Sequence, residues 1–598
     1  MTIVPPQGLR IHGESGKPPR GRSLRATKSF APGSRIATFS NPLLALPDAA
    51  HTRSTCNWCL RPGVEKGSPL PPPQNQAFTS PTAAPTTLSA CTGCRCAVYC
   101  SKACQMAAWR AGAHKLECPA LRRASSRGSG GGGPGAGAGA GGADRSGVVL
   151  PTPVRAALLL LLRLAAGDEA VRAAVGDGVL SGGRRAGASD RTGVDVMLEG
   201  NVAGFARDEA VWKDLGMQAV AAATYAGMEG LAERAEGIRE LLCMIQTNTF
   251  DRSDPDTDTG GIFLDPVLAM ANHSCVPNAF VCFSGRTAIL RAETQIHEGD
   301  EIEISYVDNT LSKRERQEAL RLYHFQCTCP RCVDDLDVYQ VCQSSPLVPL
   351  NSFSLQPDLI RLSDPPIDRS LCRPVSVASK RSSGLVASPL ERARSQWGDC
   401  ESLIRAKMFA VEPVPSVLQD LLNFYHLEKQ DFARALSLAC FLATESHPYA
   451  HVAPFKPWRV KGVMLVASLL SQTAPLAVTG ELAAACTHRD LVAALSRCDQ
   501  VSMCEALLRL VVHYGPMAHS DDWEVLRSAR ELLEDIESLQ GRERQSGLLR
   551  AWAADPKNEV GRTFFERAVL RPIRELASFA LDIASAELGP GHGAVART

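Results

Sequence analysis

The stretch Cys91-Thr-Gly-Cys94-Arg-Cys96-Ala-Val-Tyr-Cys100-Ser-Lys-Ala-Cys104 contains two closely spaced cysteine pairs. With one pair before it and one after it, eight candidate zinc ligands fall between residues 56 and 118: Cys56-x2-Cys59, Cys91-x2-Cys94, Cys100-x3-Cys104 and His114-x3-Cys118. Structural zinc is bound tetrahedrally by thiolates and imidazoles, and such a pair supplies two ligands to one ion. Four pairs in one short region favour two zinc sites over disulfides or chance.

Residues 100–118, with Trp109 between the ligand pairs, resemble a MYND zinc finger. In that family the pairs interleave, which implies one zinc ion on Cys56, Cys59, Cys100 and Cys104, and a second on Cys91, Cys94, His114 and Cys118. Cys96 is then a spare thiol. The proline-rich stretch between Cys59 and Cys91 is expected to be an extended, solvated insertion.

The overall composition is that of a globular protein with several domains. The chain has 598 residues, of which 45% are hydrophobic. Its net charge of +1 argues against nucleic-acid binding driven by global electrostatics. The first 36 residues carry seven Lys or Arg against Glu14 alone. This basic cluster is either a solvated surface or a region that attracts an anionic cofactor or an acidic partner.

Targeting signals and membrane spans are not expected. The N-terminal residues 1–6 lack the pattern of a signal peptide, which predicts an intracellular protein in the nucleus, the cytoplasm or both. The apolar run at residues 158–162 is far shorter than the roughly 20 residues of a bilayer span and is expected to be a buried helix. In a reducing compartment, the 21 cysteines are expected to be metal ligands and core thiols.

The hydrophobic pattern predicts strands, then helices, strands again and a long helical region. Strands are expected at 9–11, 23–27, 35–39, 43–46, 279–283, 287–291 and 301–306. Helices are expected at 154–175 and 209–245, and amphipathic helices at 400–409, 417–426, 432–444, 460–472, 481–508, 523–539 and 572–584. The Gly-, Ala- and Ser-rich residues 124–147 are expected to be a flexible loop.

A second informative cluster begins at Asn272-His273-Ser274-Cys275-Val-Pro277-Asn278. Alone, Asn272 and His273 would more often be a structural pair. However, the strand ending in Ser305-Tyr306 follows, and then Cys327-x-Cys329-x2-Cys332 supplies three thiolates. Cys275 is the available fourth ligand of a tetrahedral site.

This arrangement resembles the SET domain of protein lysine methyltransferases, with post-SET zinc ligands Cys275, Cys327, Cys329 and Cys332. With the finger, it resembles the SET and MYND family over residues 8 to 335. The resemblance implies an α+β fold in which a split SET β-fold carries an inserted MYND finger and a post-SET zinc site, followed by an all-α, TPR-like C-terminal domain. The predicted domains are 1–50, the N-terminal part of the SET domain; 51–120, the MYND finger; 121–150, a flexible linker; 151–260, a helical SET insertion; 261–310, the core SET domain; 311–340, the post-SET segment; 341–390, an irregular linker; and 391–598, the helical domain.

The resemblance also implies an enzyme, a protein-lysine N-methyltransferase that uses S-adenosylmethionine and holds three Zn2+ ions. The implied cofactor contacts are Gly21, Arg22, Ser23, Glu199, Asn201, Asn248, Asn272, His273, Tyr306 and Phe325. Tyr306 is the implied catalytic residue, and Tyr306, Tyr323 and Phe325 line the implied lysine channel.

Several residues leave alternatives open. Ser23 replaces the second glycine of the family's Gly-x-Gly turn and limits positive φ there. Ala269 stands where the family often has a serine, so one polar contact is expected to be absent. Glu199 and Asn201 could equally belong to a solvated loop. Without the Asn-His and cysteine motifs, Tyr306 and the channel aromatics would be core residues.

Two partner classes follow. The chain is predicted to be a monomer that acts on histone or non-histone proteins through a target lysine, without a membrane partner. The alternative is a catalytically weak scaffold whose finger binds proline-rich peptides in transcriptional regulation. Zinc-dependent nucleic-acid binding is disfavoured, because groove-reading fingers have four ligands rather than eight. The C-terminal helices are either a lid that selects substrates or a stability module.

Overall fold

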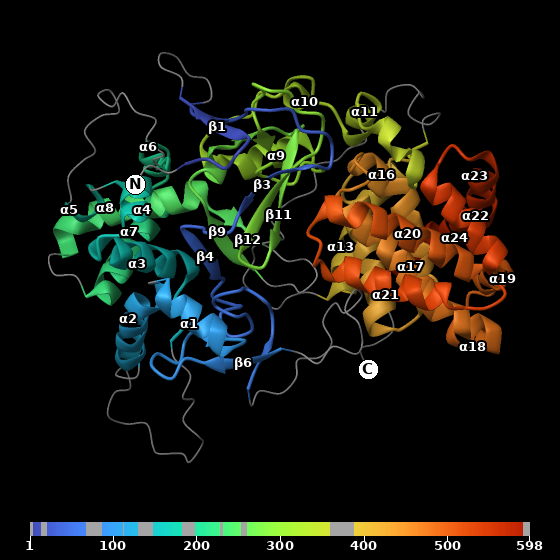
Figure 1. Cartoon of the computed structure of the whole chain (residues 1–598), viewed down its shortest axis with the longest axis horizontal. Coiled ribbons are helices and arrows are strands. Elements are labelled where there is room, and N and C mark those ends of the chain that lie inside the picture. The colour runs from blue at the N-terminus through green and yellow to red at the C-terminus, as the bar shows by residue number, and fades with distance from the viewer. Residues whose placement is uncertain are drawn as a thin grey trace. The chain divides into compact units, whose positions relative to one another are not determined.

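The computed structural model describes residues 4–13, 21–66, 86–111, 113–128, 148–176, 178–181, 198–227, 231–252, 260–358 and 388–589. The chain divides into two compact units. The first unit comprises Met1–Gln74, Thr82–Ile304 and Leu320–Gln326, and the second comprises Asn75–Pro81, Ser305–Ala319 and Cys327–Thr598. Figure 1 labels many of the elements of both units.

Small sheets in the first unit join strands from the two ends of its sequence. β3 pairs antiparallel with β12, which pairs antiparallel with β11, and β4 pairs antiparallel with β9, which also pairs with β8. β1 and β2 form an antiparallel pair, and β10 and β13 a short parallel pair. The bounds are β1 Leu9–His12, β2 Ser23–Ala26, β3 Arg35–Phe39, β4 Leu44–Pro47, β8 Phe250–Asp251, β9 Gly261–Leu264, β10 Asn272–His273, β11 Ala279–Ser284, β12 Thr287–Ala292 and β13 Glu303–Ile304. The predicted split β-fold is confirmed.

The finger lies between β4 and β9 in the sequence. Its parts are β5 Val64–Glu65, β6 Thr87–Ala90, β7 Val98–Tyr99, α1 Lys102–Arg110 and α2 Ala113–Gly128. Ser101 caps α1, because its side chain accepts a hydrogen bond from the Cys104 amide. The expected proline-rich insertion falls mostly on residues 67–85, outside the described residues.

The helical insertion of the first unit has its own apolar core. Its helices are α3 Thr152–Ala165, α4 Glu169–Val175, α5 Gly178–Ser181, α6 Val202–Phe205, α7 Glu209–Ala226 and α8 Leu231–Asn248, and the 3-10 helix η2 Leu268–Met270 follows β9. The run at 158–162 lies in α3, where Leu158, Leu160 and Leu161 are fully buried. The prediction of a buried helix at this place is confirmed.

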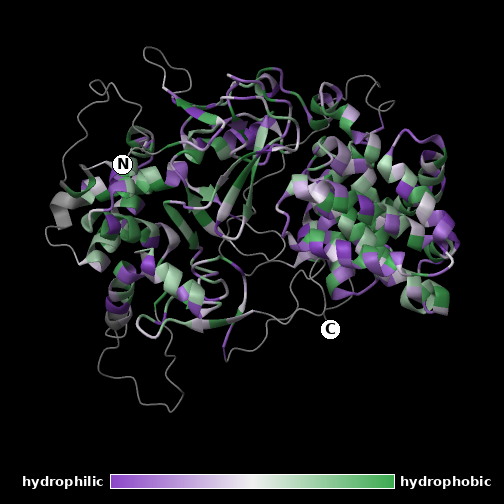
Figure 2. Cartoon of the chain, in the orientation of Figure 1, coloured by the Kyte–Doolittle hydropathy of each residue, from purple (hydrophilic) through white to green (hydrophobic). Residues whose placement is uncertain are grey.

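The second unit is almost entirely helical (Figure 1). Hydrophobic and hydrophilic residues alternate along its helices, as amphipathic helices require (Figure 2). The bounds are α9 Lys313–Leu320, α10 Pro330–Val333, α11 Val338–Gln343, η4 Val348–Phe353, α13 Pro389–Arg405, α14 Val414–Asn423, η7 Phe424–Glu428, α15 Phe432–Phe441, η8 Leu442–Ser446, α16 His447–Ala450, α17 Pro457–Thr479, α18 Leu482–Ala485, α19 Arg489–Arg497, α20 Gln500–Ala518, α21 Glu524–Glu537, α22 Glu543–Ala554, α23 Glu559–Phe565, η9 Glu566–Leu570, α24 Arg571–Ala577 and α25 Ala580–Leu588; η3 Arg321–Tyr323 belongs to the first unit.

Among the described helices, α17 alone is long and apolar enough to cross a bilayer. It packs against α15 and α20, and Arg459 and Lys461 are buried within it. The core helix of a helical array can be as apolar as a membrane span. Because α17 packs against two other helices and contains buried charged residues, we interpret it as a core helix.

Several elements differ from their predicted bounds for local reasons. The helix expected at 154–175 is two helices, because Gly167 has φ +80° and Asp168 caps α4. The segment 481–508 forms three helices, since His488 caps α19 and Asp499 caps α20. The strand expected at 301–306 contains only Glu303–Ile304.

Helices extend into both predicted linkers, and several helices were not predicted. Helix α2 continues to Gly128, whereas a loop was expected from residue 124. Within 341–390, α11 and η4 are helical. The remainder of both segments, 129–147 and 359–387, lies outside the described residues. Helices α22 and α23 were not predicted, and the domain boundaries stay predictions.

The aromatic cluster around Trp552 generates a stability prediction. Trp552 is 1% exposed and stacks on Phe565 at 3.9 Å, with Phe353 at 4.4 Å between ring centroids. Trp552→Ala should lower the free energy of unfolding by about 3–5 kcal/mol, because truncating a buried tryptophan removes its buried apolar surface and leaves a cavity. Calorimetry should show the helical transition at a clearly lower temperature. Trp458→Ala is the matched control, since Trp458 is 56% exposed, and an equal shift in both variants would contradict the prediction.

Candidate active site and zinc centres

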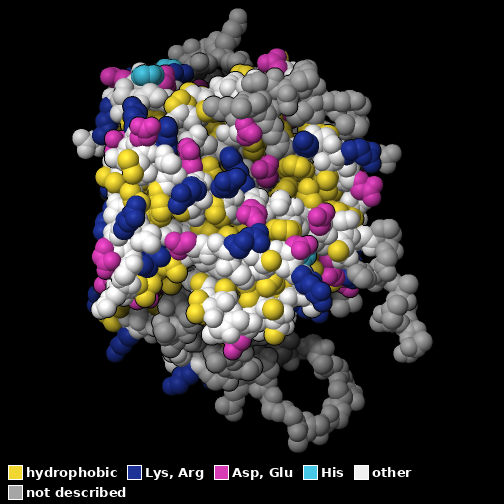
Figure 3. All heavy atoms as spheres, turned by 90° about the vertical axis from the view of Figure 1, so that its right-hand side faces the viewer, with side chains coloured by type: hydrophobic (Ala, Val, Ile, Leu, Met, Phe, Trp, Pro, Cys, Tyr) yellow, Lys and Arg dark blue, Asp and Glu magenta, His cyan; other side chains and the backbone are white. Residues whose placement is uncertain are grey.

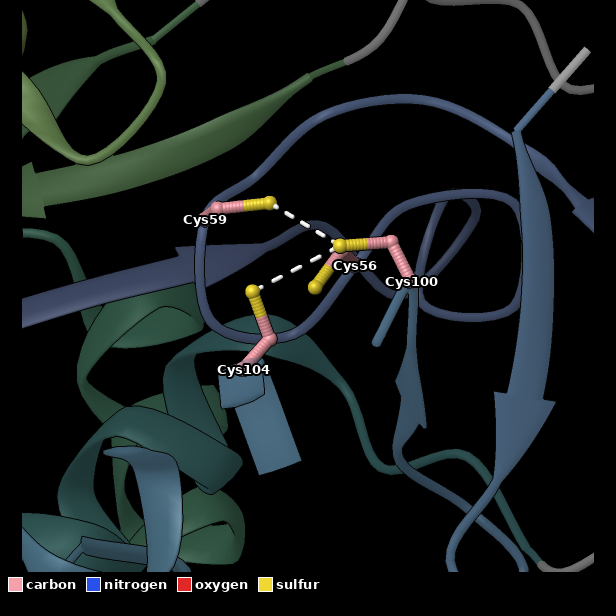
Figure 4. A group of neighbouring side chains, drawn as sticks. All are labelled: Cys56, Cys59, Cys100 and Cys104. Atoms are coloured by element: carbon pink, nitrogen blue, oxygen red, sulfur yellow. Dashed lines mark hydrogen bonds between the residues drawn. The ribbon is translucent and has the colours of Figure 1, made fainter. Parts of the chain in front are cut away.

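The first predicted zinc ligand set converges on one point. The sulfurs of Cys56, Cys59, Cys100 and Cys104 point toward one another (Figure 4) and lie within 4.8 Å. The Sγ–Sγ distance is 3.6 Å for Cys59 and Cys100, and 3.5 Å for Cys100 and Cys104. With Zn–S bonds of about 2.3 Å, the edge of a tetrahedron is about 3.8 Å. The donor set therefore fits a zinc ion.

The second set comes from the turn between β6 and β7 and from α2. The ligand atoms of Cys91, Cys94, His114 and Cys118 lie within 4.8 Å of one another. His114 Nε2 is 3.3 Å from Cys91 Sγ and 3.8 Å from Cys94 Sγ. The turn requires glycine at Gly93, because a Cβ there would lie 2.8 Å from Cys118 Sγ. This set has the three-thiolate, one-imidazole chemistry of a structural zinc site.

A buried ion pair supports the other side of the His114 ring. His114 Nδ1 lies 3.2 Å from Glu117 Oε2, and Glu117 Oε1 accepts a hydrogen bond of 2.6 Å from Arg155 Nε. Burial alone would raise the pKa of the Glu117 carboxyl, but Arg155 and His114 lower it to about 2. Sequence reasoning missed Glu117 and Arg155, since nothing in the local pattern links α2 to α3.

The third set is also brought together. The sulfurs of Cys275, Cys327, Cys329 and Cys332 lie within 4.8 Å, and all four residues are buried. All three predicted ligand sets can thus hold a metal ion. Cys96 stands outside them, with its sulfur 3.2 Å from the carbonyl oxygens of Cys94 and Val148.

Three of the predicted cofactor contacts meet at Glu199. Arg22 Nη2 forms an ion pair with Glu199 Oε1 at 2.9 Å. Asn248, at the end of α8, donates from Nδ2 to the carbonyl oxygens of Glu199 and Met244, each at 2.7 Å. Glu199 is therefore held from two directions, while its side chain is 69% exposed. Its role in the cofactor site stays a prediction.

Asn272 ties the N-terminal turn to the core strands. Its Nδ2 donates to the Arg22 carbonyl oxygen at 3.1 Å and to Glu301 Oε1 at 2.8 Å. Asn272 and His273 form β10, which pairs in parallel with β13. The His273 ring lies 5.9 Å from the Phe325 ring, centroid to centroid. Sequence reasoning missed the contact of Glu301 with Asn272.

Asn201 links the same region to residues 323–324. It adopts a left-handed conformation with φ +42°, and its Nδ2 donates to the Tyr323 carbonyl oxygen at 3.4 Å. The Phe205 and His324 rings meet edge to face at 4.4 Å. A Cβ at Gly204 would lie 2.6 Å from the His324 ring, so only glycine permits this approach.

The replaced glycine at Ser23 does not strain the turn. The positive φ of +71° falls on Gly21, while Ser23 begins strand β2 and is buried. A serine suits that extended conformation. Ala269 packs against the apolar core of the helical insertion, where a methyl group is suitable.

The predicted channel residues differ in environment. Tyr323 is half-buried, and burial with the negative charge of Asp251 raises the pKa of its hydroxyl. Phe325 is 39% exposed. Tyr306 is half-buried and follows the end of β13 by two residues. The catalytic, channel and cofactor roles of these residues stay predictions.

A family model described as the SET domain matches residues 21–307. The relatives include the SET domain and MYND-type zinc finger protein 6 of Schizosaccharomyces pombe, which is 26% identical over 319 residues, 53% of this chain and 51% of that protein. These findings support a protein of the SET and MYND type. The strand pairing, the finger and the third cysteine cluster agree with this resemblance.

Other SET and MYND relatives carry enzyme names. The human histone-lysine N-methyltransferase SMYD3 is 26% identical over 319 residues, 52% of this chain and 59% of that protein. The rat N-lysine methyltransferase SMYD2 is 37% identical over 93 residues, 15% of this chain and 22% of that protein. The match spans about half the length of the first two relatives named here.

The ligand sets predict the zinc content of this protein. The purified chain should hold three zinc ions by elemental analysis, one for each cluster. Cys104→Ser should lower the content by one ion, because a hydroxyl cannot replace the thiolate. Cys96→Ser removes a neighbouring thiol outside the ligand sets and should leave three. Loss of zinc from the Cys96 variant would contradict the ligand assignment.

Proposed function

We propose that this chain is an S-adenosylmethionine-dependent protein lysine N-methyltransferase. The observation that carries the proposal is the direct bonding among the predicted cofactor contacts. Asn272 bonds to Arg22, Arg22 to Glu199, and Asn248 to Glu199, although these residues are widely separated in the sequence. The lysine methyltransferase names of the relatives support the same function.

The reaction depends mainly on alignment. Bound S-adenosylmethionine would supply a methyl group on a positively charged sulfur, which a neutral lysine amine would take by in-line displacement. Arg22, Asn248 and Asn272 would help to hold the cofactor. Holding the reacting atoms about 3–3.5 Å apart in the correct orientation removes much of the barrier. The amide of Asn272 and the backbone at Arg22 are held by hydrogen bonds before any ligand arrives, so little reorganisation is needed on binding.

The substrate lysine must lose its proton before it reacts. A free lysine has a pKa of about 10.4, and a desolvated site close to a positive charge lowers that value. The aromatic rings of Tyr306, Tyr323 and Phe325 would provide such a surface. A tyrosine hydroxyl is protonated at neutral pH, and burial raises the pKa of Tyr323 further, so this hydroxyl can donate a hydrogen bond.

The proposed substrates are histone or non-histone proteins with an accessible lysine. The name of human SMYD3 specifies histone lysine and supports the histone class, whereas the name of rat SMYD2 specifies lysine alone. Selection among substrates is assigned to the C-terminal helices. The exposed face in Figure 3 intersperses basic and acidic side chains, which suits a protein partner better than a polyanion. A nuclear or cytoplasmic location and a monomeric state stay predictions.

Peptide binding by the finger is a separate property that could accompany catalysis. Met106 and Trp109 on α1 are 39% and 45% exposed. Exposed aromatic side chains suit proline-rich peptides, which dock on aromatic surfaces. The comparisons do not favour a scaffold without activity. The hypothesis of an inactive, peptide-binding scaffold is therefore tested by the same activity measurement.

Tyr306→Phe should lower methyl transfer by about tenfold or more, because the ring remains while the hydroxyl that orients the amine is lost. The measurement is transfer of radiolabelled methyl from S-adenosylmethionine to lysine in extract proteins, with zinc-loaded, folded enzyme. Tyr339→Phe is the control, since its hydroxyl accepts a hydrogen bond from the Ala410 amide in the helical unit. No lysine label from the wild-type chain would favour the peptide-binding scaffold.

Asn272→Asp should weaken S-adenosylmethionine binding by about tenfold or more, measured by titration calorimetry. The substitution replaces the Asn272 NH2 donor by a carboxylate oxygen, which would face the Arg22 carbonyl oxygen and the Glu301 carboxylate. Acceptors would then face acceptors without a hydrogen bond, which disfavours the observed conformation of the turn. The control, Asn351→Asp, makes the same chemical change in the helical unit. This variant should bind S-adenosylmethionine with the wild-type affinity. Equal affinity in wild type and Asn272→Asp would remove Asn272 from the cofactor site.

A further inference from the structure

We propose that Arg155 is a positioning residue for the zinc ligand His114. It acts through Glu117 and couples the second zinc site of the finger to helix α3 of the SET insertion. The inference concerns metal retention and finger docking, and it is independent of the methyltransferase proposal.

The chain of contacts is continuous from the helix to the metal ligand. Arg155 donates hydrogen bonds to both carboxylate oxygens of Glu117, from Nε to Oε1 at 2.6 Å and from Nη2 to Oε2 at 3.2 Å. Glu117 Oε2 lies 3.2 Å from His114 Nδ1, while Nε2 of the same ring faces the sulfurs of Cys91 and Cys94. A carboxylate at Nδ1 favours the tautomer with a proton there, which leaves Nε2 free to bind zinc.

The burial of this pair requires an explanation beyond surface charge. The side chains of Arg155 and Glu117 are 5% and 3% exposed, and that of His114 is 3% exposed. Burying an ion pair costs desolvation that apolar residues of similar volume would not incur. A role in orienting a metal ligand accounts for an arginine and a glutamate at these positions. The Tyr99 and Trp109 rings, at 5.6 and 6.1 Å from the imidazole, complete its packing.

Helix α3 is placed to transmit this contact. Arg155, Leu158 and Leu162 are spaced by three and four residues and share one face. Leu158 belongs to the apolar cluster that contains Cys91, Cys94 and Cys118, and the partly buried Leu162 packs against that cluster. Ala156, Leu160 and Leu164 belong to the core of the helical insertion. One helix therefore packs against the zinc-bearing core and the SET insertion together.

The test is zinc release from the full chain into a chromogenic chelator. In Arg155→Met, one of the three zinc equivalents should leave about 10–100-fold faster, the usual loss when a ligand's supporting carboxylate network is broken. The other two should leave at the wild-type rate. Arg163→Met is the matched control. It removes an arginine from the same helix, where Arg163 pairs with Asp168 and the Leu43 carbonyl oxygen, and it should leave all three rates unchanged.

A second variant separates positioning from packing. Glu117→Gln keeps the side-chain volume and one oxygen that can accept the hydrogen bond from Arg155 Nε, so it is the second variant to examine if Arg155→Met does not fold. In cobalt-substituted protein it should shift the visible absorption of the three-sulfur, one-nitrogen site and leave the all-sulfur sites unchanged. Wild-type zinc release in both variants, or equal acceleration of all three equivalents, would overturn the proposal.

Discussion

The pairing of β4 with β9 is the constraint on which the first unit depends. It joins Leu44 to Leu264 and Pro47 to Gly261, so one antiparallel register closes a loop over residues 48–260. Closing a loop of this length costs about 5 kcal/mol by the logarithmic estimate of chain entropy. The finger and the helical insertion both lie within the loop. Binding of a structural zinc ion contributes about 10–16 kcal/mol of folding free energy in small domains. Metal-stabilised structure inside the loop therefore offsets the entropic cost of closing it.

Both zinc sites of the finger contact SET elements. At the first site, Arg252 donates to the Gly285 and Leu60 carbonyl oxygens at 2.8 and 3.4 Å. Arg286 lies over the Trp58 ring at 4.2 Å. At the second site, Arg155 from α3 holds Glu117. The finger therefore meets the turn between β11 and β12 at one metal site and the helical insertion at the other.

The sequence predicts what is encoded locally. Zinc pairs such as Cys56-x2-Cys59 are recognised because both ligands come from one turn, and strands such as β3 and β12 because side chains alternate. Contacts made across long sequence separations are not written in any window, which is why Arg155–Glu117 and Asn272–Glu301 were missed. Helix boundaries failed where a single capping residue, Asp168 or Asp499, interrupts an otherwise continuous apolar pattern.

The turn at Gly21 shows how a departure from a family motif can be neutral. A motif with two glycines does not say which of them needs a left-handed backbone. Here Gly21 has that conformation and Ser23 lies in a strand, so the replacement falls where a side chain is permitted. The Arg22 carbonyl between them accepts the Asn272 hydrogen bond. Because that contact uses backbone, it is insensitive to the side chain at position 22, whose guanidinium is left to pair with Glu199. The anchor of the turn and its charged contact are therefore separate functions of one residue.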